Sequence, residues 1–151
     1  MSYDAKIERI SEILSRILHL MGGRAYSKTK LVKLLYLLDV IQSRRDKPRF
    51  SGVNYVSYYY GPYSDDIEES IDFLEELGYI SVMRREPNNG NLYYLIQLKA
   101  LPQFGQLADD EKLEIREILL PLARLDLEEL LDITYATPEF SEAPFGEAIV
   151  V

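Results

Sequence analysis

Apolar side chains recur every three or four residues in five stretches of the chain, which predicts five amphipathic helices. The predicted helices span about residues 4–21, 27–43, 65–77, 109–122 and 126–133. Gly22 and Gly78 follow the first and third of these, and glycine often ends a helix because it accepts a positive φ. Ser64 is expected to cap the third helix, and Pro121 is expected to bend or end the fourth.

Three shorter runs are rich in aromatic and β-branched residues, which predicts strands at residues 55–60, 79–85 and 92–98. The last two are separated by Pro87-Asn88-Asn89-Gly90, whose Asn-Gly pair indicates a hairpin turn. The basic segment 44–49 contains a proline and predicts a loop.

The order of these elements predicts an α+β fold that is mainly α, a helical domain with a winged-helix-like core and a small β-hairpin. In that arrangement residues 65–77 form the recognition helix and residues 87–91 the wing tip. We expect a single domain over residues 1–140, followed by a C-terminal tail over residues 141–151 that lies on the surface. The chain has 151 residues, enough to bury a core of its own.

The composition argues against most catalytic and metal sites. Cysteine is absent, which excludes disulfides, thiolate ligands and a cysteine nucleophile. The one histidine, His19, lies between two leucines and is expected to be structural. Neither a Gly-x-Ser-x-Gly motif nor a phosphate-binding loop is present. We therefore expect no enzymatic activity, no catalytic residues, no metal and no cofactor.

The same sequence predicts a cytoplasmic protein without a membrane partner. The first residues show no signal-peptide pattern, and no apolar run approaches about 18 residues. These features are expected of a chain that is neither exported nor inserted into a bilayer.

Charge is unevenly distributed along the chain, whose net charge is −8. Residues 1–50 hold eleven Lys and Arg against five Asp and Glu, whereas residues 51–151 hold six against twenty. The predicted helix 65–77 carries seven acidic residues and no basic ones. A helix that enters the major groove between phosphate strands needs the opposite sign, so a nucleic-acid partner is not expected. A solvated helix face explains these acids better than a metal or acid–base site.

Five tyrosines fall within nine positions: Tyr55, Tyr58, Tyr59, Tyr60 and Tyr63. Aromatic rings with a polar tip are typical of protein interfaces. We expect a partner-binding surface between Tyr59 and Tyr63, flanked by the basic loop 44–49, in which Arg44, Arg45 and Arg49 favour a partner that carries carboxylates. The alternative is that these tyrosines close the core and that the partner binds the acidic helix.

Three separated motifs resemble the Panacea domain, which is also described as antitoxin-like. They are Lys30-Leu31-Val32-Lys33-Leu34-Leu35-Tyr36, then Tyr60-Gly61-Pro62, then the segment from Leu74 to Ile80. The segment from Leu130 to Pro138 is similar to the family's final helix and the proline after it. The chain departs from the family at Thr134-Tyr135, where many members carry a histidine, and it shows no attached DNA-binding domain.

The resemblance implies a small, mainly helical cytoplasmic protein of bacteria, archaea or phages that acts as an antitoxin by direct contact with a toxin. The expected function is therefore non-enzymatic protein binding that blocks the toxin by occlusion. One alternative is a winged-helix transcription regulator that uses the basic N-terminal half. Another is an adaptor that delivers a partner to a protease. A homo-oligomer is compatible with all three.

The motifs also predict local structure. We expect Gly61 to have a positive φ in a turn and Pro62 to precede the helix cap. Tyr36 should lie in the core with its hydroxyl group hydrogen bonded. Lys30 and Lys33, on the polar side of their helix, should bind acids of helix 65–77 or carbonyl groups, not phosphate.

Overall fold

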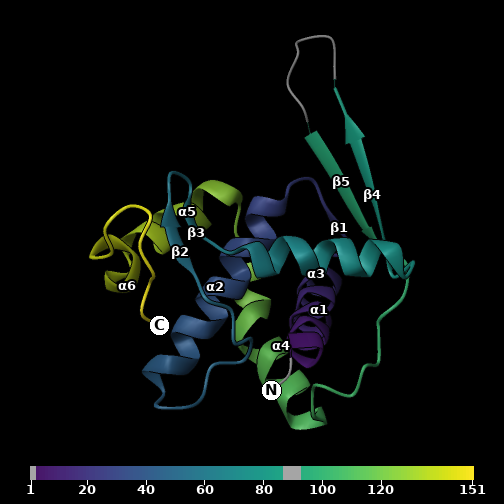
Figure 1. Cartoon of the computed structure of the whole chain (residues 1–151), viewed down its shortest axis with the longest axis horizontal. Helices are drawn as coiled ribbons and strands as arrows, with labels where there is room; N and C mark the ends of the chain where they lie inside the picture. The colour runs from purple at the N-terminus through teal and green to yellow at the C-terminus, as the bar shows by residue number, and fades with distance from the viewer. Residues whose placement is uncertain (1–2, 87–92) are drawn as a thin grey trace.

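The computed structural model describes residues 3–86 and 93–151, and its fold is α+β and mainly α, as predicted (Figure 1). The described helices are α1 (Tyr3–Leu20), α2 (Lys28–Arg44), α3 (Asp65–Glu76), α4 (Asp109–Ala123), α5 (Leu127–Ala136) and α6 (Pro138–Ser141). The described strands are β1 (Arg24–Ala25), β2 (Val56–Tyr58), β3 (Gly61–Tyr63), β4 (Ile80–Arg85) and β5 (Tyr93–Leu98).

The strands form two separate antiparallel sheets. One has the order β1-β5-β4, and the other consists of β2 and β3. The hairpin of β4 and β5 follows α3, as the sequence predicts, with Ile80 opposite Leu98. The expected wing tip, residues 87–91, lies outside the described residues. The winged-helix description of the core therefore stays a prediction, and so does the domain boundary at residue 140.

Helix α2 lies at the centre of the molecule. It contacts α1, α4, α5, β1 and β3, and residues 31–40 are all buried. Because neighbours surround this helix, its polar residues Lys33 and Asp39 are buried together with its leucines. A helix with one apolar face and one solvated face is what the spacing predicts, and that prediction is wrong for α2.

Several helix ends form as the sequence predicts. The Ser64 side chain accepts a hydrogen bond from the Asp66 backbone N–H at 3.2 Å and caps α3. Gly78 follows the end of α3 with φ +83°. Pro121 lies inside α4, which ends two residues later.

The tyrosine-rich segment folds differently from the prediction. Instead of one strand broken by Gly61 and Pro62, the chain turns at Tyr59 and Tyr60, and Gly61 and Pro62 belong to the second strand of a hairpin. Gly61 has the expected positive φ, +106°, which suits the residue after a tight turn. Proline is tolerated in β3 because this strand is an outer one, and its missing N–H is not needed for a further ladder.

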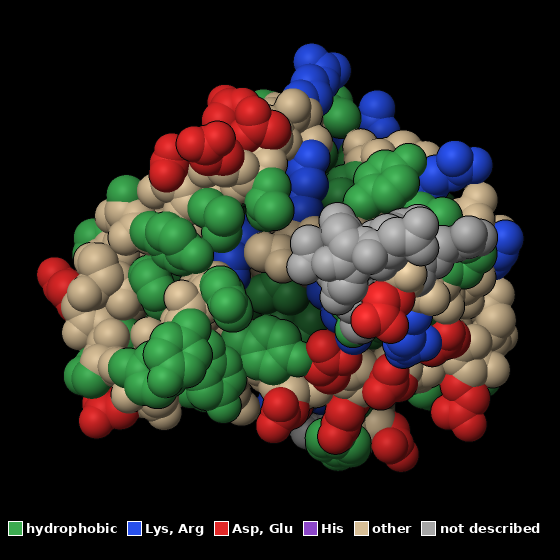
Figure 2. Space-filling model, turned by 90° about the horizontal axis from the view of Figure 1, so that it is seen from above, with side chains coloured by type: hydrophobic (Ala, Val, Ile, Leu, Met, Phe, Trp, Pro, Cys, Tyr) green, Lys and Arg blue, Asp and Glu red, His purple; other side chains and the backbone are tan. Residues whose placement is uncertain are grey.

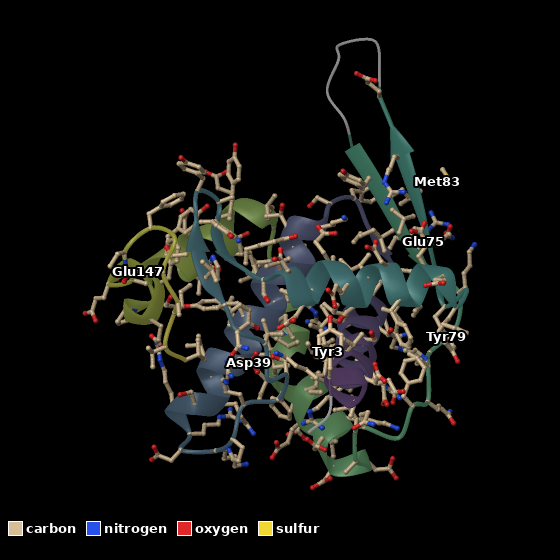
Figure 3. All side chains as sticks on the ribbon, viewed as in Figure 1. Tyr3, Asp39, Glu75, Tyr79, Met83 and Glu147 are labelled. Carbon is tan, nitrogen blue, oxygen red and sulfur yellow. The ribbon has the colours of Figure 1, made fainter. Side chains whose placement is uncertain are left out.

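The end of the chain packs against the free side of β2. The Gly146 N–H donates to the Ser57 carbonyl at 2.7 Å, and the Ile149 N–H donates to the Tyr55 carbonyl at 2.9 Å. The Ile149 side chain is buried. Glu147, labelled in Figure 3, lies in this segment at the edge of the molecule, and its carbonyl accepts from the Ser57 N–H. The hairpin is thus held between α2 and the C-terminal segment.

Candidate partner-binding site

A hollow of about 250 Å³ lies between the first half of α2 and the hairpin of β2 and β3. Its lining is mainly apolar and aromatic, and it comes from two of the sequence motifs described above. The lining residues are Lys28, Thr29, Val32, Lys33, Tyr58, Tyr60, Gly61, Pro62 and Tyr63. Figure 2 views the molecule from above Figure 1, onto the face that carries the tip of the β2–β3 hairpin, and it shows hydrophobic side chains gathered around a hollow.

Lys33 is the buried cation of this hollow. Its side chain is 3% exposed, and its Nζ donates a long hydrogen bond of 3.5 Å to the Pro62 carbonyl. None of the ion pairs found among the described residues includes Lys33. Burial lowers the pKa of Lys33 from 10.5 to about 8. The expected carbonyl partner is confirmed, whereas the expected position on the polar side of the helix is wrong.

Gly61 leaves the space that the Lys33 ammonium group occupies. A Cβ at Gly61 would lie 2.8 Å from Lys33 Nζ and 3.1 Å from Tyr135 Cε1. Together with the positive φ, these short distances explain why glycine stands here. The K-L-x-K-L-L-Y motif and the Y-G-P motif therefore meet at one point in space.

The second lysine in the lining, Lys28, is already neutralised. Its Nζ lies 2.8 Å and 3.1 Å from the two carboxylate oxygens of Glu68 on α3, and Tyr63 is hydrogen bonded to the same carboxylate. Burial opposes ionisation of Glu68, but the hydrogen bonds from Lys28 and Tyr63 outweigh it and hold the pKa of Glu68 below its ordinary value. Lys33 remains the cation of the lining without a carboxylate among the described residues.

An ion pair of 2.9 Å between Lys6 and Asp66 also links α1 to α3. Lys30 instead donates to the Ala123 carbonyl at 3.1 Å. The expectation that Lys30 binds an acid or a carbonyl group is confirmed through the carbonyl. The acids of α3 were expected to bind Lys30 and Lys33, but they form ion pairs with Lys6 and Lys28 instead.

Exposed aromatic rings lie at the hollow and beside it. Tyr59 is 83% exposed and Tyr60 is 81% exposed at the tip of the hairpin. Phe145 from the C-terminal segment packs on Tyr59 with ring centroids 4.4 Å apart and on Tyr58 at 6.2 Å. Tyr63 is half-buried against Tyr58, so it is less accessible than Tyr59. Sequence reasoning missed Phe145, because a lone aromatic in a Pro- and Gly-containing segment gives no periodic signal.

A buried polar network supports the base of the hairpin. The Tyr36 ring is fully buried and its hydroxyl lies 2.7 Å from Thr137 Oγ1, so the prediction for Tyr36 is confirmed. The Tyr36 ring meets the Tyr55 ring edge-on at 5.3 Å, and the Tyr55 hydroxyl donates to Asp39 at 2.7 Å. Ser51 donates to the same carboxylate through its N–H and its hydroxyl.

Asp39 lies inside the molecule near the lower half of α2 in Figure 3. Burial raises the pKa of Asp39, and the hydrogen bonds from Ser51 and Tyr55 oppose that shift. All of these bonds come from the segment that leads into β2. The network therefore fixes where the hairpin begins.

The basic loop 44–49 does not flank the tyrosines, and that part of the prediction is wrong. Arg44 stands eleven residues beyond Lys33 on α2, about 16 Å along the helix axis. Figure 1 shows this loop and the tip of the β2–β3 hairpin at opposite ends of α2. Arg44 pairs with Glu139 at 2.9 Å, and Arg49 donates to the Val53 carbonyl at 2.6 Å. Arg45 is exposed in the same loop.

A larger hollow of about 570 Å³ lies between α1 and α3 and is rich in acids, including Glu8, Glu69, Asp72 and Glu76. Over residues 3–86 and 93–151, no group of three or more His, Asp or Glu side chains is arranged to hold a metal ion. His19 is exposed. Within the same two ranges, the helices are too short or too polar to cross a membrane.

Comparison with known proteins gives one match. The family model described as antitoxin SocA-like, Panacea domain, matches residues 31–139, which is more than half of the chain. The match begins on α2 and ends in α6, so it includes both strands of the hairpin and the lining of the hollow except Lys28 and Thr29. No curated protein and no solved structure matches the chain.

Proposed function

The chain belongs to the SocA-like antitoxin family with a Panacea domain, and from this premise we propose that it is a non-enzymatic cytoplasmic antitoxin. In this proposal it binds a partner toxin directly and blocks it by occlusion. The family supports a protein partner for the chain. The proposal adds that the binding surface is the face formed by the β2–β3 hairpin, the adjoining hollow and Phe145, which we call the hairpin face.

The observation that carries the proposal is the exposed aromatic cluster on this face. Tyr59, Tyr60 and Phe145 are each more than half exposed, although buried hydrogen bonds fix the base of the hairpin that carries the two tyrosines and on which Phe145 packs. Tyrosine supplies large contact area at a low cost in conformational entropy, and such residues dominate binding energy at protein interfaces. Neighbouring exposed aromatics on and beside a fixed hairpin are therefore better explained by a partner than by folding.

DNA binding through α3 is disfavoured by charge. The exposed residues of α3 include Asp65, Glu69, Asp72 and Glu76, and this helix carries no Lys or Arg. Phosphate groups along the major groove would be repelled by that surface. A transcription regulator would have to bind DNA through another element.

The test begins with the genes that lie next to the gene for this chain. Each is expressed in a bacterial host, alone and together with the chain, and growth is measured. We expect one neighbour to stop growth alone and to become harmless with the chain. The purified pair should form a complex in which the toxin's activity is lost.

The binding surface is tested with the double variant Tyr59→Ala/Tyr60→Ala. The control is Tyr26→Ala, because Tyr26 is also exposed, at 69%, but lies outside the hollow. The double variant should keep its melting temperature and lose protection, while the control should protect fully. A folded double variant that neutralises as well as the parent chain would exclude the hairpin face.

A further inference from the structure

We propose that the Lys33 ammonium group receives an Asp or Glu carboxylate that the partner protein inserts into the hollow between α2 and the β2–β3 hairpin. This inference rests on the proposed function, because it assigns one contact within the hairpin face. It names a receptor group on this chain and the chemistry of the partner residue that reaches it.

The first argument is the charge balance of the lysines. Lys6, Lys28 and Lys47 each lie 2.8–2.9 Å from a carboxylate oxygen. Lys33 is more buried than any of them and has only the long bond to the Pro62 carbonyl among the described residues. A buried charge is unfavourable unless an opposite charge or good hydrogen bonds compensate it. A carboxylate from outside would supply that compensation.

The second argument is the size and lining of the hollow. Its volume of about 250 Å³ lies below the range of about 300–1,000 Å³ that drug-sized ligands occupy. A single side chain fits this space better than a cofactor does. The apolar lining from Val32 and Pro62 suits the methylene groups of an Asp or Glu side chain, whose carboxylate then meets Lys33.

The third argument concerns what lies around the mouth. Tyr58 and Tyr60 line the hollow, Tyr60 is 81% exposed, and Phe145 packs on Tyr58 and Tyr59 beside it. A small free carboxylate would leave these rings in water. A protein segment with an acidic residue covers the rings and fills the hollow at the same time, so we assign the hollow to a protein segment.

The fourth argument is that Gly61 leaves room for the ammonium group in its present position. Any side chain at position 61 would begin 2.8 Å from Lys33 Nζ and would push the lysine out of its position. The geometry therefore depends on both motif residues. A carboxylate that enters the hollow meets a charge that is already positioned and largely stripped of water, which strengthens the ion pair.

The first experiment needs no identified toxin. The full chain, with its lysines labelled with ¹³C at Cε, is titrated by NMR, and the Lys33 signal is assigned from a Lys33→Met sample. The probes, at millimolar concentration, are acetyl-Leu-Glu-Leu-amide, the matching Gln peptide and sodium acetate. We expect the Glu peptide to shift the Lys33 signal and to raise the Lys33 pKa from about 8 by at least about one unit, which corresponds to tenfold tighter binding to the charged form.

Two results would overturn the proposal. One is a Lys33 signal that does not respond to the Glu peptide, or that responds equally to the Gln peptide. The other is a response to acetate as large as the response to the peptide, which would assign the hollow to free carboxylates. Both results can be read even if no neighbouring gene encodes a toxin, so they are independent of the proposed function.

The second experiment uses the neutralised toxin. Lys33→Met is compared with Lys30→Met, a matched variant on the same helix whose lysine does not line the hollow. We expect Lys33→Met to weaken toxin binding by at least about 30-fold, as loss of one member of a desolvated charge pair does, and Lys30→Met to change it by less than about twofold. A folded Lys33→Met chain that binds as tightly as the parent contradicts the proposal.

Discussion

Helix α2 carries a buried carboxylate, Asp39, in one region and a buried ammonium group, Lys33, in another. The two groups differ in the hydrogen bonds that the rest of the chain makes to them. Asp39 accepts hydrogen bonds from Ser51 and Tyr55, so donors within the chain stabilise its carboxylate. Lys33, six residues earlier, has a single long bond, to a carbonyl group, within the part of the chain that the structure describes. The difference separates a buried charge that holds the fold together from one that is left available to a partner.

The largest change in the free energy of unfolding is expected when the carboxylate of Asp39 is removed. Asp39→Ala leaves the Tyr55 hydroxyl and the Ser51 hydroxyl buried without their acceptor, so it should lower the free energy of unfolding by about 3–5 kcal/mol. Denaturant-induced unfolding of the full chain measures this loss. If Asp39→Ala costs less than about 1 kcal/mol, the network does not hold the base of the hairpin.

Removal of the Lys33 ammonium group is expected to raise the free energy of unfolding, the opposite of the change expected for Asp39→Ala. Lys33→Met removes a buried charge whose pKa is lowered from 10.5 to about 8 by burial, and each pKa unit corresponds to about 1.4 kcal/mol. The variant should be more stable than the parent chain by about 1–3 kcal/mol near neutral pH. Lys30→Met, which loses a bond to the Ala123 carbonyl, should bring no such gain. A destabilised Lys33→Met chain would show that Lys33 serves the fold after all.

The stability gain should also depend on pH, with a sign set by the same group. Between pH 8 and 10.5 the unfolded chain binds more protons at Lys33 than the folded chain does, so the parent gains stability as the pH rises. The advantage of Lys33→Met should therefore be complete below pH 8 and shrink above it. Unfolding curves of both chains across this range measure the trend. A constant difference would assign the stabilisation to packing.

The smallest effects are expected in the basic loop. Arg44 pairs with Glu139 and Lys47 pairs with Glu114 on exposed surface. Exposed pairs contribute only about 0.2–1 kcal/mol, so Arg44→Ala and Lys47→Ala should unfold almost as the parent does and neutralise the toxin equally well. A loss of neutralisation in Arg44→Ala would place the partner on the loop as well as on the hairpin face.

Local signals in the sequence predict the five longer helices but not α6, and they predict the caps at Ser64 and Gly78, the positive φ of Gly61 and the buried, hydrogen-bonded Tyr36. These features depend on spacing or on the backbone preference of a single residue type. The turn at Tyr59 and Tyr60 was missed because tyrosines are not typical turn residues. The sequence of residues 141–151 does not reveal that they pack on β2, because the hydrogen bonds that hold them depend on where β2 lies.

The burial of Lys33 was also missed, for a different reason. The spacing along α2 predicts one apolar face, but α1, α4, α5, β1 and β3 enclose the helix, which no local pattern of that helix reveals. The position of the basic loop follows from the same helix, because its length carries Arg44 away from the hairpin. Sequence reasoning thus found the motif residues and the tyrosines, and the structure showed which of them meet.

The most direct test of this account is the side-chain pKa of Lys33, measured by NMR in the free chain and in its complex with the neutralised toxin. The account predicts a pKa of about 8 in the free chain and a value above the ordinary 10.5 in the complex, because a partner carboxylate then stabilises the charged form. A pKa that stays near 8 or falls further on binding would show that the partner brings no carboxylate to Lys33 and would contradict the account.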